Sequence, residues 1–303
     1  MTFDYISARG DRLPLATNEL FELTHVDGMT NIATSISSSE IATGDGDIIT
    51  NVQAEPRPIT IDLRIREGVN VEDAKRAILR VVKIKQRGSL EWKQGGRAVI
   101  LSGIVEAIDL PRWTNAATMQ ISLYCSQPYW EDVDFVVQQI SEAIDLHWFE
   151  DSSSGMLYFP AEGIALGEYD TIRTKPFYNS GDVAVGIEIS IVAYDTVTNP
   201  IIYDGNGNYF GLGYVLETQS DNPQLGSALY SKPFYMEAGD HVVITTHKGN
   251  KTVKKNGVSV FDYFKPQSKW LQMEAGDNLF TINSDDDSLT NMTFSLEYKQ
   301  RYV

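Results

Sequence analysis

Histidine, cysteine and carboxylate side chains are the groups that could carry chemistry in this 303-residue chain, which has four histidines, one cysteine and 41 acidic residues. The histidines nearest to each other in sequence, His241 and His247, flank one predicted strand. They point to the same face because they are an even number of positions apart. Strand rise separates them by about 20 Å, which is too far to share a metal ion. The sequence therefore predicts no metal site built on histidine.

Cys125 ends a segment, Ile121–Cys125, in which apolar and polar residues alternate. It shares a face with Ile121 and Leu123, a position that favours a buried thiol over a nucleophile. A single cysteine also excludes an internal disulfide and a zinc site with several thiolates. The chain has no Gly-x-Ser-x-Gly elbow and no phosphate-binding glycine loop. We therefore predict no catalytic residue and no cofactor.

One loop, Asp204–Asn208, carries oxygen-bearing side chains at alternate positions, as calcium-binding loops do. The sixth position of such a loop is glycine and the twelfth is glutamate, whereas this chain has Tyr209 and Val215 there. The sequence therefore favours a hairpin turn. The acidic run Ser284–Ser288 is typical of a solvated turn, so no metal ligand is predicted.

Charge is unevenly distributed along the chain. The formal net charge of −16 disfavours binding to duplex DNA, because such binding depends on a basic surface. Residues 64–97 run the other way, with ten basic and four acidic side chains. This segment predicts either a solvated helix face or a surface that meets an acidic surface, including one on another copy of the chain.

The first half of the sequence reads as β-strands with one helix. Strands are predicted from apolar alternation at residues 59–66, 98–108 and 118–124. A helix is predicted over residues 71–87, with Asn70 as its N-cap and Gly88 at its end. Basic residues crowd the C-terminal end of this helix, where cations suit the helix dipole.

A long hairpin arm is predicted ahead of these strands. The turn-forming segment 43–47 separates residues 35–41 from residues 48–52. Apolar residues near its tip are Ile48, Ile49 and Val52. Such residues are unusual near a loop tip unless a partner covers them, so they are candidates for a subunit interface.

The second half of the chain reads as short strands and turns. Residues 132–146 fit either a strand or a helix. Beyond them, frequent turns such as Asn256–Gly257 predict a β-sandwich. The pentapeptide Met236–Asp240 recurs as Met273–Asp277, each time before an apolar strand. This repeat predicts a recurring turn, in which glycine has a positive φ and aspartate bonds the backbone beyond it, rather than a repeated binding site.

The order and spacing of several segments resemble a known family, the distal tail proteins (Dit) of long-tailed phages of Gram-positive bacteria. The resemblance covers essentially the whole chain, although the Tyr-x-Gly-Val that the family often shows near its end is absent. The matching segments are 57–61, 71–87, 103–105, 118–129, 155–160, 179–182, 199–202, 238–246, 251–253, 268–271, 276–280 and 302–303.

This resemblance implies a mainly β (β-rich α+β) fold. Residues 1–135 would form an N-terminal split-barrel-like domain with one helix, the ring-forming belt. Residues 136–303 would form a C-terminal galectin-like β-sandwich outside the ring. The chain would be a non-enzymatic virion protein, a homohexameric hub that joins the tail tube to the baseplate or tail tip and lets DNA pass through its centre without specific binding.

The implied partners are other copies of the chain, the tail tube protein, the baseplate or tail-tip hub or tail-associated lysin protein, and a receptor-binding protein. The resemblance implies no membrane and no cofactor. The protein would be made in the cytoplasm of the bacterial host and would lie at the distal end of the phage tail. Contractile and non-contractile tails, and tail-like particles, all remain open.

The basic segment supplies the rest of the predicted subunit interface, which comprises Lys75, Arg76, Arg80, Lys83 and Arg87. We expect these side chains to face a neighbouring subunit or the outer surface, because a channel that DNA crosses should not bind it. The alternative function is a tail-associated module that binds carbohydrate or the host cell wall. Its aromatic platform would come from Trp148, Tyr158, Tyr203, Tyr209 and Trp270, although core packing is the more common role of such residues.

Overall fold

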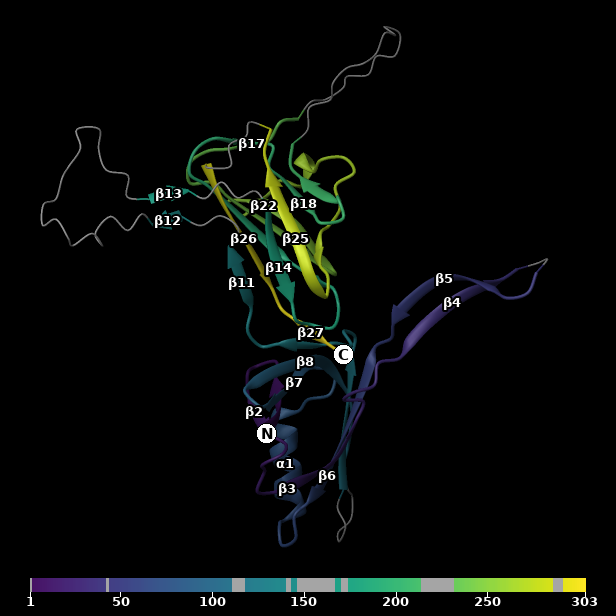
Figure 1. The fold of residues 1–303 in the computed structure, drawn as a ribbon. Coiled ribbons are helices and arrows are strands. Elements are labelled where there is room, and N and C mark those ends of the chain that lie inside the picture. Colours follow the sequence, from purple (N-terminus) through teal and green to yellow (C-terminus); the bar gives the residue numbers. More distant parts are fainter. Residues whose placement is uncertain are drawn as a thin grey trace, which may run out of the picture. The chain divides into compact units, whose positions relative to one another are not determined.

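The structure is a computed structural model that describes residues 2–41, 44–110, 118–139, 143–145, 167–169, 174–213, 232–285 and 291–303. It divides into two compact units (Figure 1). Unit 1 comprises Met1–Asp134 and Arg301–Val303, and unit 2 comprises Phe135–Gln300. The last three residues thus lie in unit 1, not with the 136–303 segment, because β27 (Arg301–Tyr302) pairs with β10 (Trp130–Asp132).

Unit 1 is built on an antiparallel sheet of nine strands within the described residues. Seven of them follow the order β2-β1-β7-β8-β9-β6-β3, and β10 pairs with both β8 and β27. The bounds are β1 Thr2–Ser7, β2 Arg12–Pro14, β3 Phe21–Asp27, β6 Arg57–Ile65, β7 Arg87–Gln94, β8 Arg97–Asp109 and β9 Thr118–Cys125. The strands predicted from apolar alternation are confirmed as β6, β8 and β9.

The two-residue period of these strands explains the core of unit 1. On β6, Ile59, Ile61 and Leu63 are fully buried, and the residues between them face outward. The buried residues of β9 join the same core, as do Ala74 and Ile78 of the helix. Alternation on the strands and helical spacing on α1 therefore converge on one apolar cluster.

Helix α1 (Val71–Val81) starts as predicted and ends six residues early. The Asn70 side chain accepts a hydrogen bond from the Glu72 N–H, which caps the first turn. Val82 is already extended, and Lys85 has a positive φ of 66°. The Lys85 N–H donates to the Val105 carbonyl, so pairing with β8 replaces helical bonding. The prediction that the helix reaches residue 87 is wrong for this reason.

Gly88 is a buried residue of β7 rather than the end of the helix. A Cβ at this position would lie 2.1 Å from the Tyr5 hydroxyl oxygen, and Tyr5 is itself buried. We expect Gly88→Ala to lower the free energy of unfolding by about 1–3 kcal/mol, because the Tyr5 ring must leave a packed site. Urea denaturation checks this, with Gly44→Ala as the control, since a Cβ at exposed Gly44 would come no closer than 3.5 Å to the Ile41 side chain. Equal losses for both variants would contradict the steric explanation.

The predicted hairpin arm is confirmed. Strands β4 (Thr34–Glu40) and β5 (Asp47–Ala54) pair with each other and form a separate two-stranded sheet. Figure 1 shows the arm as a ribbon that leads away from the sheet of unit 1. Apart from two half-buried positions, the described residues of both strands are exposed.

Unit 2 contains two larger antiparallel sheets around one core. Their orders are β11-β26-β16-β21-β22-β23 and β14-β25-β18-β19. The bounds are β11 Val136–Gln139, β14 Thr174–Asn179, β16 Glu188–Ala193, β18 Ile201–Asp204, β19 Tyr209–Gly211, β21 His241–His247, β22 Asn250–Lys255, β23 Val258–Ser259, β25 Gly276–Asn283 and β26 Met292–Tyr298. Ile189 and Phe294 of the first sheet share a buried cluster with Phe280 of the second, as in a β-sandwich.

Three short two-stranded ladders complete the described part of unit 2. They pair β12 (Ala143–Asp145) with β13 (Gly167–Tyr169), β15 (Val185–Gly186) with β24 (Gln272–Met273), and β17 (Val197–Thr198) with β20 (Tyr235–Met236). The ambiguous segment 132–146 is strand wherever the structure describes an element in it, as the end of β10, β11 and β12. The fold is therefore mainly β with one α-helix in its described part, which confirms the predicted fold class. None of the helices in that part is long and apolar enough to cross a membrane.

Candidate assembly interface

Where the structure describes them, the chemistry-bearing residues that the sequence singled out do not converge on a reaction centre. Cys125 is fully buried, and burial raises the pKa of its thiol to about 11, which confirms the packed thiol. His241 Nε2 lies 2.6 Å from the Ser190 hydroxyl. His147 falls outside the described residues. Across the positions that the structure describes, no group of three or more histidine, cysteine or acidic residues could hold a metal ion.

The Asp204 loop is a hairpin turn between β18 and β19, as predicted. The Asp204 carboxylate accepts hydrogen bonds from the backbone N–H groups of Asn206 and Asn208 at 2.9 and 2.8 Å. Its other oxygen accepts from the Asn208 side chain at 2.8 Å. The turn itself therefore uses the carboxylate, as an Asx turn does.

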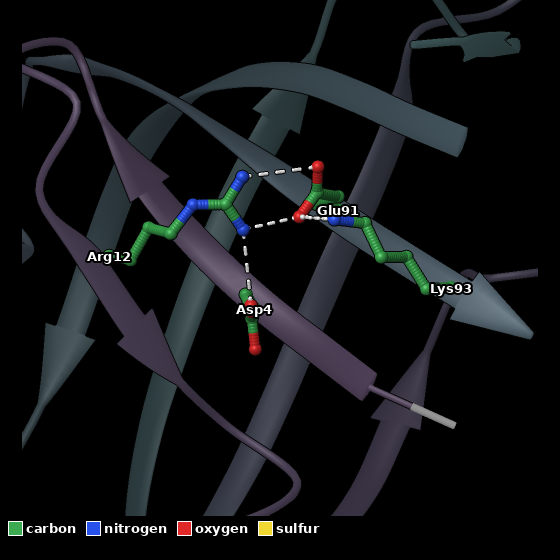
Figure 2. A network of polar contacts seen from close by, with 4 residues as sticks. All are labelled: Asp4, Arg12, Glu91 and Lys93. Atoms are coloured by element: carbon green, nitrogen blue, oxygen red, sulfur yellow. Dashed lines mark hydrogen bonds and ion pairs between the residues drawn. The ribbon is translucent and has the colours of Figure 1, made fainter. Parts of the chain in front are cut away.

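A charged network in unit 1 joins three strands (Figure 2). Asp4 of β1 and Glu91 of β7 lie directly opposite each other, and Arg12 of β2 bridges the two carboxylates. Lys93 adds a contact to Glu91 at 3.1 Å. The hydrogen bond from Arg12 is the main reason that the pKa of Glu91 is lowered although its side chain is buried. Because each charge is paired, this network ties β2 to the sheet.

The repeated pentapeptide forms two turns that differ in one respect. In both, the methionine is buried and the glycine has a positive φ, 90° at Gly239 and 85° at Gly276. In the first turn, Asp240 accepts a hydrogen bond from the Glu237 N–H and pairs with Lys255 at 2.7 Å. In the second, Asn278 accepts the equivalent bond, from the Glu274 N–H. The prediction of a recurring turn is confirmed. In the first copy the aspartate accepts from the backbone before it, and in the second copy Asn278 takes this role.

Asp240 should give unit 2 a pH-dependent stability. The Glu237 N–H, with Lys255 and Asn256, lowers the pKa of Asp240 to about 2. An unfolded aspartate titrates near pH 3.9, so the stabilisation is full above about pH 4 and is lost as the pH falls toward 2. We expect Asp240→Ala to cost about 1–2 kcal/mol at pH 7, with a smaller difference from the unmodified chain below pH 4.

Asp277→Ala is the matched control for that measurement, because Asp277 occupies the same repeat position and is exposed. Its effect should stay within about 0.5 kcal/mol at every pH. Thermal unfolding from pH 2 to pH 7 compares the two. A difference between Asp240→Ala and the unmodified chain that does not change with pH would contradict the electrostatic origin.

The arm carries its apolar residues mainly on one face. Ile36 pairs with Val52. Thr50 is an extra, unpaired residue of β5, a β-bulge, so Ile49 lies opposite Ser38. The register shift brings Ile49 to the face of Ile36 and Val52. We call these three residues the arm stripe; their side chains are 61, 61 and 57% exposed for Ile36, Ile49 and Val52.

The arm stripe contains two of the three predicted interface residues of the arm, Ile49 and Val52. Ile48 is also exposed, but it lies opposite Ser39 and therefore faces the other way. Ile36 was missed, because its role follows from the cross-strand register and not from the order of residues. The bulge at Thr50 has no clear signal in the sequence.

The predicted basic residues lie along α1 (Lys75, Arg76 and Arg80), in the turn after it (Lys83) and at the start of β7 (Arg87). Four of them are exposed, and Lys85 joins them; we call the basic patch Arg76, Arg80, Lys83, Lys85 and Arg87. Within the described part of the chain, none of these five makes a salt bridge. Lys75 differs, because it is half-buried and pairs with Glu72 at 2.8 Å. The structure thus separates Lys75 from the other predicted cations.

Three residues of the aromatic platform predicted for the alternative function are described by the structure: Tyr203, Tyr209 and Trp270. Trp270 is half-buried and stacks against Phe264 and Phe261, with ring centroids 5.5 and 6.1 Å apart. The Tyr209 hydroxyl donates to the Pro266 carbonyl. Trp148 and Tyr158 lie outside the described residues. The ring of Tyr203 packs against that of Tyr209, with the two centroids 5.9 Å apart.

The described residues form two β-rich units, and unit 1 exposes a hairpin arm and the basic patch. Residues 231–302 match the family model of the siphovirus-type tail component, C-terminal domain. No curated protein matches the chain.

Several solved structures are similar to this chain, among them two from phages. The first is the crystal structure of phage SPP1 Dit, described as a paradigm of the hub adsorption apparatus in phages that infect Gram-positive bacteria. It has a TM-score of 0.62 and 12% sequence identity, with 100% of both chains covered. The second is the phage p2 baseplate in its activated conformation with Sr, with a TM-score of 0.46 and 9% identity, covering 99% of this chain and 97% of the other. The family match and the shared fold of SPP1 Dit confirm the predicted resemblance to distal tail proteins.

Proposed function

We propose that this chain is a structural hub protein at the distal end of a phage tail, where six copies form a ring. The ring would join the tail tube to the baseplate or tail tip. The match of residues 231–302 to a tail component family and the fold shared with SPP1 Dit support this proposal. In the proposed arrangement, unit 1 (residues 1–134 and 301–303) forms the ring and unit 2 (residues 135–300) forms a sandwich outside it.

The observation that carries the ring proposal is the uncovered arm. A two-stranded hairpin is only marginally stable in water, and this one exposes the three large apolar side chains of the arm stripe. A partner that covers these residues would remove apolar surface from water and stabilise the arm. In a ring, a neighbouring copy of the chain would be that partner, because every copy presents the same surfaces to the next one.

The charge of the chain fits passage of DNA through the ring. A net charge of −16 repels a polyanion, so DNA would slide without being held. The proposed partners are the tail tube protein on one side and the baseplate or tail-tip hub, lysin or receptor-binding protein on the other. The chain would act through these contacts and not through catalysis, after synthesis in the host cytoplasm.

Native mass spectrometry of the purified full chain tests the proposal. The expected species has a mass six times that of the 33.8 kDa chain. A closed oligomer of another size would correct the number of subunits. A monomer at every concentration would contradict the proposed ring.

A further inference from the structure

We propose that the arm of one copy docks on the basic patch of the next copy around the ring. Glu40, Asp45 and Asp47 of the arm, which we call the acidic flank, would meet the cations. The arm stripe would cover an apolar row beside these cations. This proposal rests on the proposed ring, and it adds which two surfaces meet.

The docking surface on unit 1 has an apolar row at its centre. Arg87 of β7 lies opposite Ile104 of β8, and Ile104 lies opposite Tyr124 of β9. Opposed residues on neighbouring strands have their Cβ atoms about 5 Å apart, so the three side chains form one continuous row. Ile104 and Tyr124 are each 44% exposed. An exposed isoleucine and tyrosine side by side on a sheet face offer apolar surface that a partner could cover.

Two of the cations, Lys85 and Arg87, lie next to this row. The Lys85 N–H donates to the Val105 carbonyl, and the Val105 N–H donates to the Gln86 carbonyl, at 2.9 and 3.1 Å. These bonds hold the turn after α1 against β8, beside Ile104. Ile84 in the same turn is 51% exposed and extends the apolar surface. The surface therefore combines apolar side chains with a rim of lysine and arginine.

The arm has the complementary composition. Between residues 30 and 56 the chain has four acidic residues and no basic one. These residues, all exposed, are Glu40, Asp45, Asp47 and Glu55. The basic patch shows the reverse, because no acidic residue occurs between Asp73 and Glu91. In a chain with an excess of 16 negative charges, this separation favours an arm-to-patch contact over arm-to-arm contact, which would bring like charges together.

The ion pairs and the apolar contacts would contribute differently to assembly. Exposed ion pairs contribute little to affinity one by one, but they set orientation and exclude wrong pairings. The arm stripe and the row of Ile104 and Tyr124 would supply most of the affinity by burial. A ring built this way should weaken as salt screens the rim charges, and it should not fall apart at moderate salt.

Charge reversal in the full chain tests the pairing. One variant reverses the arm (Glu40→Lys, Asp45→Lys and Asp47→Lys). A second reverses the patch (Arg80→Glu, Lys83→Glu and Arg87→Glu). All six positions are exposed, so the fold should be unchanged by circular dichroism. The control is Glu237→Lys with Glu274→Lys and Asp277→Lys. It makes the same charge change as the arm variant, on exposed positions of unit 2.

Native mass spectrometry should show that each reversed variant needs at least about tenfold more protein than the unmodified chain to form the ring. The control should assemble like the unmodified chain. Mixing the two reversed variants should restore rings of intermediate mass that contain both chains, since each arm then meets a patch of opposite charge. A chain that carries both reversals should also assemble.

Two results would overturn the docking proposal and leave the proposed ring intact. One is a normal ring from either reversed variant. The other is the loss of the ring in both variants with no rescue on mixing or in the doubly reversed chain. Absence of a ring from the unmodified chain would instead contradict the proposed function itself.

Discussion

Replacing residues 40–50 by a tight Asn-Gly turn is expected to convert the ring into monomers. The replacement removes Ile49 of the arm stripe together with the acidic flank, and leaves a short hairpin closed by a favourable turn. Because the arm makes a separate sheet, its shortening should not disturb the core of unit 1. Native mass spectrometry and circular dichroism together separate loss of assembly from loss of fold.

A milder variant isolates the apolar contribution. Ile36→Ser, Ile49→Ser and Val52→Ser keep the length of the arm and its charges, and we expect the monomer to dominate here too, because the buried apolar surface is lost. Val258→Ser is the matched control, since Val258 is a 68% exposed apolar residue on a strand of unit 2. An intact ring from the arm variants would show that the arm is not an assembly element.

Asn179→Ala is expected to destabilise unit 2 by about 2–4 kcal/mol, more than Asp240→Ala does. Asn179 is 1% exposed at the end of β14. Its amide nitrogen lies 3.2 Å from the carbonyl oxygens of both Val183 and Glu274, and its Oδ1 accepts a hydrogen bond from the Gly181 N–H. Alanine leaves these buried backbone groups without a partner, and each such group is costly to bury.

Asn206→Ala is the control for this loss, because Asn206 is an exposed residue of a turn and bonds through its backbone. Its effect should stay within about 0.5 kcal/mol. Urea unfolding followed by near-ultraviolet circular dichroism measures both variants. A cost below about 1 kcal/mol for Asn179→Ala would mean that water replaces the side chain and that the hydrogen bonds do not hold the loop.

Local patterns were enough to predict much of the fold. Alternation over residues 59–66 identified β6, the Asn70 cap identified the start of α1, and Asn256–Gly257 identified the turn between β22 and β23. In each case neighbours in sequence determine the structure. Positive φ at Asn256 and Gly257, 50° and 81°, is what that dipeptide favours.

Features that depend on distant residues could not be predicted in the same way. The early end of α1 depends on bonds between Lys85 and Val105, which lie far apart in the sequence. Arg57 is 1% exposed, and its guanidinium donates to the Met29 carbonyl, although a charged residue at the start of a strand would be expected to face water. Burial lowers the pKa of Arg57, in agreement with this position.

The candidate interface shows the same division. The excess of cations over residues 64–97 is visible in the sequence, and so are Ile48, Ile49 and Val52. Ile104 and Tyr124 were missed because they lie on strands whose alternation only marks them as outward-facing. Their adjacency to Arg87 follows from the order β7-β8-β9. Strand order is a property of the whole sheet, so no local pattern carries it.

Negative-stain electron microscopy of the purified full chain tests the proposed function most directly. We expect closed rings with a central hole and six equivalent subunits, and the variant with the shortened arm should show single particles under the same conditions. A uniform population of monomers from the unmodified chain, or aggregates without a central hole, would contradict the proposed hub.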